Sequence, residues 1–163
     1  MPIDSKVSVG KREKKEYPPL PETIYQVELL DVTAHQNATY QTRNKPKEEQ
    51  EIETILNFQF TLLAGTQNGE ALRGRNVWAN FVPAYLYIGK NGKNALYRIV
   101  EALLGRDLTL EEEGGGIDEK FLNSLISKQC RIFTKHKKSG NSVYNNIESY
   151  AVIDAQLPSL TDE

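Results

Sequence analysis

The sequence lacks the residues that several classes of protein require. Its single cysteine, Cys130, excludes an internal disulfide framework. Its only histidines, His35 and His136, do not complete a zinc-ligand spacing with that thiol. It contains no Gly-Lys-Ser/Thr phosphate loop, no His-Glu-x-x-His metal helix and no Gly-x-Ser-x-Gly elbow. We therefore expect no catalytic residues, no metal and no other cofactor, and a function in binding.

Long apolar segments are also missing. None of the uncharged apolar runs is long enough to span a bilayer. Residues 1–15 carry charges without the apolar segment of a secretory signal. A length of 163 residues, with 39% apolar and 26% charged residues, suits one ordinary folded domain. These features predict a cytoplasmic protein with no membrane partner.

The net charge of -2 conceals an alternation of sign along the chain. Residues 71–106 contain six bases and one acid, residues 107–119 contain six acids and no base, and residues 120–147 contain six bases and no acid. Because binding follows the local field and not the total charge, a polyanion-binding face is compatible with this composition. A solvated surface with unevenly scattered charge is the alternative.

The two ends of the chain differ in composition from its middle. Residues 1–22 join a charged tract to a proline-rich stretch, which predicts a flexible arm. We expect residues 155–163 to form a flexible C-terminal tail. The folded domain is then predicted to cover residues 23–154.

The clearest strand lies at 52–63, where apolar and polar residues alternate. A preceding strand is predicted at 23–33, with a bulge where the apolar parity changes at Leu29-Leu30. The Asn68-Gly69 pair is typical of a hairpin turn, so a third strand at 72–82 should run antiparallel to the second. Two further strands are predicted at 129–137 and 142–152.

Two helices are expected between the third and fourth strands. Apolar residues recur at helical spacing from Leu96 to Leu104, and Gly105 ends this pattern. Asp118 is placed to cap a short helix that reaches Ile126, after an acidic, glycine-rich loop. Five strands with helical structure between the third and fourth give the chain order of an OB-fold. We therefore predict a mostly β domain that forms a five-stranded, OB-fold-like Greek-key barrel.

The predicted fourth strand combines charge with an aromatic ring. Arg131, Phe133, Lys135 and Lys137 fall on one face, which would supply cations for phosphates and a ring for an unpaired base. The structural alternative is that such rings belong to the core. The predicted nucleic-acid-binding residues are Arg73, Arg75, Trp78, Phe81, Arg131, Phe133, Lys135, Lys137, Lys138 and Tyr144. Further contacts are expected from three loop residues, Arg43, Lys45 and Lys47.

Four segments, at 72–82, 103–105, 125–131 and 144–147, resemble small single-stranded-DNA-binding proteins of bacteriophages and mobile elements. The resemblance covers about residues 22 to 153. It implies an OB-fold that coats single-stranded DNA during replication or recombination in a bacterial or phage-infected cell. Replication or recombination proteins, and further copies of the chain, are partners consistent with that role.

Other functions remain open at this stage. The residues do not distinguish DNA from RNA. A protein-interaction module, such as a phage adaptor or inhibitor, would use the same basic face to hold an acidic partner. A carbohydrate-binding module would use Trp78 and the tyrosines, but it leaves the clustered charge unexplained.

Overall fold

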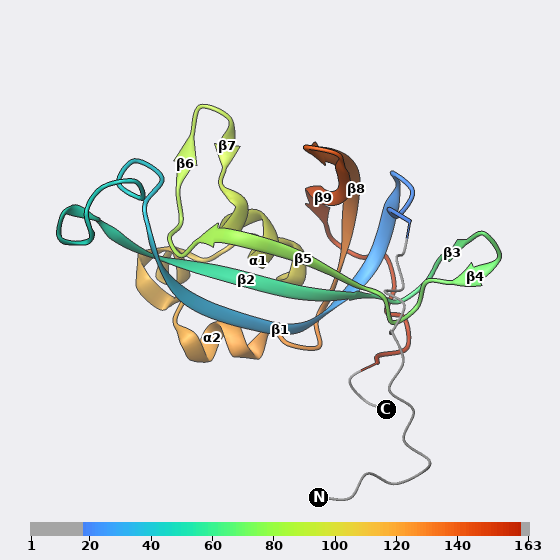
Figure 1. Cartoon of the computed structure of the whole chain (residues 1–163). Helices are drawn as coiled ribbons and strands as arrows, with labels where there is room; N and C mark the ends of the chain where they lie inside the picture. The colour runs from blue at the N-terminus through green and yellow to red at the C-terminus, as the bar shows by residue number, and fades with distance from the viewer. Residues whose placement is uncertain (1–17, 161–163) are drawn as a thin grey trace, which may run out of the picture.

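Five antiparallel strands form the main sheet, in the order β5-β2-β1-β8-β9 (Figure 1). The computed structural model describes residues 18–160. The strands of the main sheet are β1 (Ile24–Ala38), β2 (Ile52–Leu62), β5 (Asn76–Pro83), β8 (Gln129–Ser139) and β9 (Ser142–Ala151). The prediction of a mostly β chain with five strands is confirmed. The predicted charged tract at 11–16 lies outside the described residues.

Strand β1 is longer than its sequence suggests. Residues 34–38 are mostly polar, yet they continue the ladder with β2 as far as the pair Ala38 and Ile52. The predicted bulge is confirmed by a shift of register between Leu29 and Asp31. The loop from β1 to β2 is consequently shorter than predicted and contains one turn of 3-10 helix, η1 (Lys47–Glu49).

Two small hairpins project from the connections of the main sheet (Figure 1). The first, β3 (Thr66–Gln67) with β4 (Glu70–Ala71), turns at Asn68-Gly69 as predicted. The second, β6 (Ile88–Gly89) with β7 (Gly92–Lys93), has strands of two residues that no periodic pattern could reveal. In the view of Figure 1 it projects upward from the sheet, as the β8–β9 hairpin does.

The core lies between one side of the sheet and the helices. The alternating residues of β2 place Leu56, Phe58, Phe60 and Leu62 in this core, as the period of two predicts. Helix α1 (Ala95–Leu104) buries its apolar stripe against them. Burial of this surface is the main favourable contribution to folding.

The predicted Gly105 end of α1 and the predicted Asp118 cap of the second helix are both confirmed. The Asn94 side chain accepts a hydrogen bond from the Tyr97 N–H, and Gly105 ends α1 in the left-handed conformation. Helix α2 (Glu119–Ser124) is capped by Asp118 and is shorter than expected. The acidic segment before it was predicted to be a loop; it contains a π-helical turn, η2 (Glu112–Gly116), in which Gly114 and Gly115 depart from helical backbone angles.

The sheet is open at its two outer strands. Within residues 18–160, β5 and β9 form no hydrogen-bonded ladder with each other. Cys130 and Ile132 of β8 face the core, whereas their neighbours Arg131 and Phe133 face outward. The prediction that charged residues and Phe133 share one face of this strand is therefore confirmed.

The folded unit extends further at both ends than predicted. Leu20 is buried in the core, and its backbone N–H donates to Asn145 Oδ1 at 2.8 Å. At the other end, the Gln129 side chain donates to the Leu157 carbonyl at 2.8 Å and accepts from the Leu157 N–H at 3.0 Å. Residues 155–160 thus lie along the sheet, held by hydrogen bonds, whereas residues 161–163 of the expected flexible tail lie outside the described residues.

Candidate nucleic-acid interface

A shallow depression lies beside Trp78 on the exposed side of the sheet. Register sets Asp31 opposite Gln59 and Gln59 opposite Trp78, so the three side chains form one row across β1, β2 and β5. Trp78 is 50% exposed and therefore lies outside the core, as a stacking role requires. The depression is lined by Asp31, Thr33, Asn57, Gln59, Trp78 and Asn80.

A bulge in β5 changes the position of Phe81. Simple alternation would put Phe81 on the side opposite Trp78. In the structure, Asn80 and Phe81 together face one residue of β2, and Phe81 adopts a φ of 59°. Its N–H donates to Asn57 Oδ1 at 3.0 Å. As a result Val82 returns to the core and Phe81 is 69% exposed, so both rings of β5 are open to solvent.

Exposed aromatic residues also occur in three connections around the sheet. In the β1–β2 loop, the Arg43 guanidinium lies 4.4 Å from the centre of the Tyr40 ring. Exposed Tyr85 and Tyr87 precede the β6–β7 hairpin. In the β8–β9 hairpin, Tyr144 pairs with Lys137. Three of these tyrosines, Tyr40, Tyr85 and Tyr87, were missed as candidates, although an aromatic residue in a polar connection is a usable signal.

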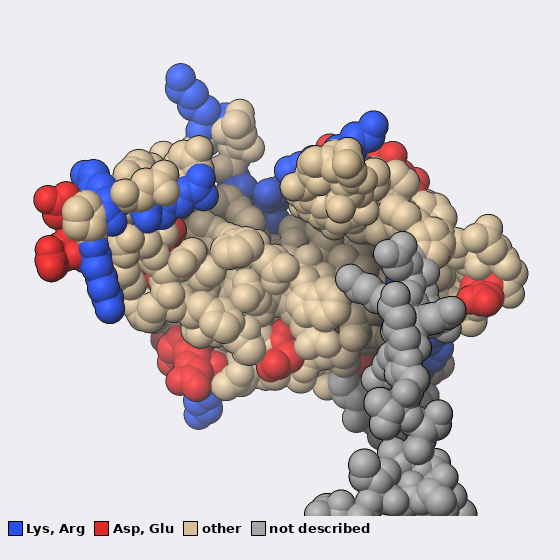
Figure 2. Space-filling model, viewed as in Figure 1, with Lys and Arg blue, Asp and Glu red and all other residues tan. Residues whose placement is uncertain are grey.

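The exposed cations gather near the same connections. Figure 2 shows Lys and Arg side chains over the β1–β2 loop, at the β6–β7 hairpin and at the β8–β9 hairpin, with few charges at the centre of this face. The loop residues Arg43, Lys45 and Lys47 are all exposed, as their predicted role requires. Lys137 and Lys138 are exposed near the hairpin tip. Because neighbours in a strand face opposite sides, these two lysines cannot serve one flat face.

Three arginines that were predicted to bind nucleic acid instead form hydrogen bonds within the protein. Arg73 donates to the carbonyl oxygens of Leu63 and Pro158. Arg75 donates to Gln67 Oε1 and to the Pro18 carbonyl. Arg131 donates to the Val152 carbonyl at 2.7 Å and lies 3.4 Å from an Asp154 carboxylate oxygen. These arginines hold the two chain ends against the sheet, which sequence alone could not reveal.

The remaining aromatic candidates differ in exposure. Phe133 is half-buried, with the Lys135 ammonium 5.8 Å from its ring centre. Lys135 also lies 3.7 Å from Glu148, so its charge is partly compensated. Tyr150 of β9 does not belong to the exposed surface. Its ring packs 6.3 Å from Phe60, and burial raises the pKa of its hydroxyl.

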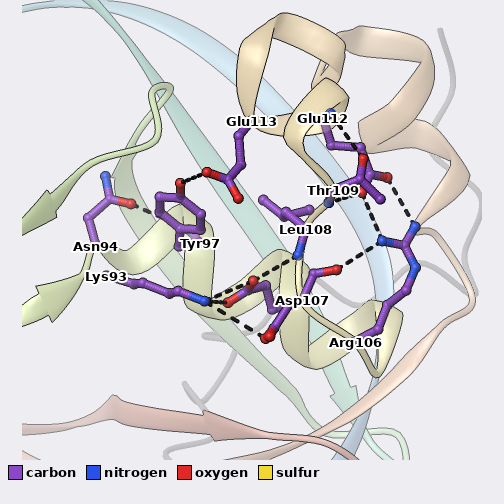
Figure 3. A network of polar contacts seen from close by, with 10 residues as sticks. Lys93, Asn94, Tyr97, Arg106, Asp107, Leu108, Thr109, Glu112 and Glu113 are labelled. Carbon is purple, nitrogen blue, oxygen red and sulfur yellow. Dashed lines mark hydrogen bonds and ion pairs between the residues drawn. The ribbon is translucent and has the colours of Figure 1, made fainter.

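A network of polar contacts joins the acidic segment to α1 (Figure 3). Lys93 Nζ lies 2.7 Å from Glu101 Oε1, and this hydrogen bond raises the Lys93 pKa. Arg106 forms two hydrogen bonds to Glu112, at 2.8 and 3.0 Å. These contacts, followed by the Thr109 N–H, lower the Glu112 pKa to about 2. The Lys93 ammonium, just before α1, is therefore engaged by acidic side chains of the protein.

Among residues 18–160, no group of three or more His, Cys, Asp and Glu side chains is placed to hold a metal ion. Burial raises the pKa of the Cys130 thiol to about 12, which makes it a poor nucleophile. The same part of the chain has no helix that is long and apolar enough to cross a membrane.

Comparison of the chain with models of known protein families finds no match, and comparison with curated proteins finds none either. The arguments for function therefore rest on the geometry described above.

Proposed function

We propose that this protein binds single-stranded DNA with little sequence preference, without catalysing a reaction. Unpaired bases would stack on Trp78 and Phe81, and phosphates would contact the lysines and arginines of the surrounding loops. Both contributions are general, because every base has a π-face and every nucleotide has a phosphate.

The observation that carries this proposal is the exposure of Trp78 and Phe81 on one strand. Large aromatic rings usually contribute to the core or to an interface. In β5 a bulge turns a second ring outward where regular pairing would have buried it. Such bulges occur often next to binding sites, where they redirect a side chain.

An OB-like arrangement supports the same function. Strand β1 pairs with both β2 and β8, β2 pairs with β5, and β8 pairs with β9. We propose that this sheet is an OB-fold variant whose barrel stays open between β5 and β9. In OB-folds the sheet face and adjacent loops bind oligonucleotides, which agrees with the location of Trp78 and the three connections with aromatic residues.

Titration of Trp78 fluorescence with an oligothymidine, at several salt concentrations, tests this function. Binding should quench the indole emission, and the logarithm of the association constant should fall linearly with the logarithm of salt concentration. Double-stranded DNA of the same length serves as the control and should compete weakly. An absence of both quenching and salt-dependent affinity would refute the proposal. Nuclease-resistant capture of one protein partner would favour the interaction module instead.

A further inference from the structure

The depression beside Trp78 has a different chemistry from the loops around it. Asp31 is exposed, and within residues 18–160 no cation lies within ion-pair distance of its carboxylate. Its Oδ1 accepts a hydrogen bond from the Val32 N–H at 2.9 Å. A carboxylate repels phosphate. The depression is therefore suited to a base edge that donates hydrogen bonds, and not to the nucleic-acid backbone.

The neighbouring amides supply donors. Asn57 Oδ1 accepts from the Phe81 N–H, so this contact identifies the oxygen and leaves the Asn57 NH2 group as a donor. In the described part of the chain, the side chains of Gln59 and Asn80 have no hydrogen bond to the protein. The depression thus combines a carboxylate acceptor with amide groups that are available to a ligand.

The spacing fits one base. Trp78 and Asp31 are separated by the single strand β2, a distance of about 10 Å between their backbones. A base stacked on the indole would lie over Gln59 and present an edge to β1. Asp31 and Asn57 are diagonal neighbours on paired strands, which places them about 7 to 8 Å apart. Side chains at this separation can contact adjacent groups on one base edge.

We propose that this depression binds a guanine base, and this inference rests on the proposed function. The Watson–Crick edge of guanine presents two adjacent donors, N1–H and the N2 amino group, beside the O6 acceptor. Asp31 accepts from both donors, Asn57 donates to O6, and Trp78 stacks on the ring. Thymine has an acceptor on each side of its single N–H, so it cannot donate twice to Asp31. Cytosine and adenine lack the paired donors.

The test compares oligothymidines that are short enough to hold one protein and that carry a central thymine, guanine or hypoxanthine. Hypoxanthine keeps N1–H and O6 but lacks the N2 amino group. With the full chain, guanine should bind about tenfold more tightly than thymine, and hypoxanthine should lie between them. All three should show the same salt dependence, because the number of phosphates is unchanged.

The variant Asp31→Asn should remove the guanine preference, so that oligomers with a central guanine and a central thymine bind with equal affinity. Glu119→Gln, which removes a charge on α2, should keep the preference. Equal affinity of the parent protein for all three oligomers overturns the guanine site but leaves single-strand binding intact. Equal affinity for guanine and hypoxanthine overturns the two-donor contact to Asp31. Failure to bind any oligomer overturns both this inference and the proposed function.

Discussion

At the scale of single residues, the two exposed rings of β5 differ in what holds them. Trp78 lies in regular pairing opposite Gln59. Phe81 instead depends on a left-handed backbone conformation that is rare for residues other than glycine. The Asn57 side chain, 24 residues away, stabilises that conformation by accepting the Phe81 N–H. The outward position of Phe81 should therefore depend on Asn57, whereas the position of Trp78 is set by regular strand pairing.

Substitution of Trp78 by alanine should weaken oligothymidine binding by about 1 to 3 kcal/mol, the usual contribution of one base stacked on an aromatic residue. The salt dependence should not change, because no phosphate contact is lost. Fluorescence anisotropy of a labelled oligomer measures both quantities. Leu110→Ala is a matched control, since Leu110 is 88% exposed on the segment between α1 and α2 and should have no effect. Equal affinities of the Trp78 and Leu110 variants for the oligomer would contradict base stacking on Trp78.

Substitution of Lys137 by alanine should weaken the electrostatic contribution to DNA binding. Each phosphate contact to a single strand adds about 0.7 to the salt slope. Losing one contact should therefore flatten the slope by about that amount, with similar losses for every sequence. Lys120→Ala, on α2, is the charge-matched control. A slope that is unchanged in the Lys137 variant would exclude this hairpin from the phosphate path.

At the scale of elements, the acidic segment has a structural role. Glu112 accepts from Arg106 and from the Thr109 N–H, and it therefore holds the π-helical turn to the end of α1. The related pair Lys93 and Glu101 holds the β6–β7 hairpin to the same helix. Glu112 of the acidic segment thus compensates Arg106, whereas Glu101 of α1 holds the hairpin that follows Tyr85 and Tyr87.

This role predicts a pH dependence of stability. The folded-state pKa of Glu112, about 2, lies below its ordinary value of 4.5. Ionised Glu112 therefore stabilises the folded protein above about pH 4.5, and this contribution disappears as the pH falls toward 2. Glu112→Gln should lower the melting temperature at pH 7, and the difference from the parent should vanish near pH 2. Glu119→Gln, which lacks such a partner in the described residues, should show no comparable change. A constant difference across this range would contradict the prediction.

The pattern of β2, the end of α1 at Gly105 and the Asp118 cap of α2 could be predicted because they depend on neighbours in the sequence. The position of Phe81 could not, because its conformation depends on a contact with another strand. The structural roles of Arg73, Arg75 and Arg131 could not be predicted from the sequence either. Arg73 contacts a carbonyl 85 residues away, and no local pattern distinguishes such a contact from phosphate binding. Sequence therefore predicted the exposed Trp78 and the basic hairpin more reliably than the cations that contact chain ends.

At the scale of the whole molecule, both chain ends complete the domain. Leu20 is fully buried, and its carbonyl accepts from the Asn145 amide at 3.0 Å. The Leu20 backbone is thereby hydrogen-bonded to the β8–β9 hairpin, which contains Lys137 and Tyr144. The chain start consequently positions part of the candidate interface.

Loss of this contact should destabilise the fold. Leu20→Ala removes a buried side chain and should lower the free energy of unfolding by about 2 to 5 kcal/mol, as measured by urea denaturation. A chain that begins at Thr23 should lose at least as much, whereas a chain that begins at Pro18 keeps Leu20 and its hydrogen bonds to Asn145. Comparison of these two shortened chains isolates residues 18–22. Equal stability of the two shortened chains would show that the domain begins after the proline-rich segment. It would also show that residues 18–22 do not stabilise the β8–β9 hairpin.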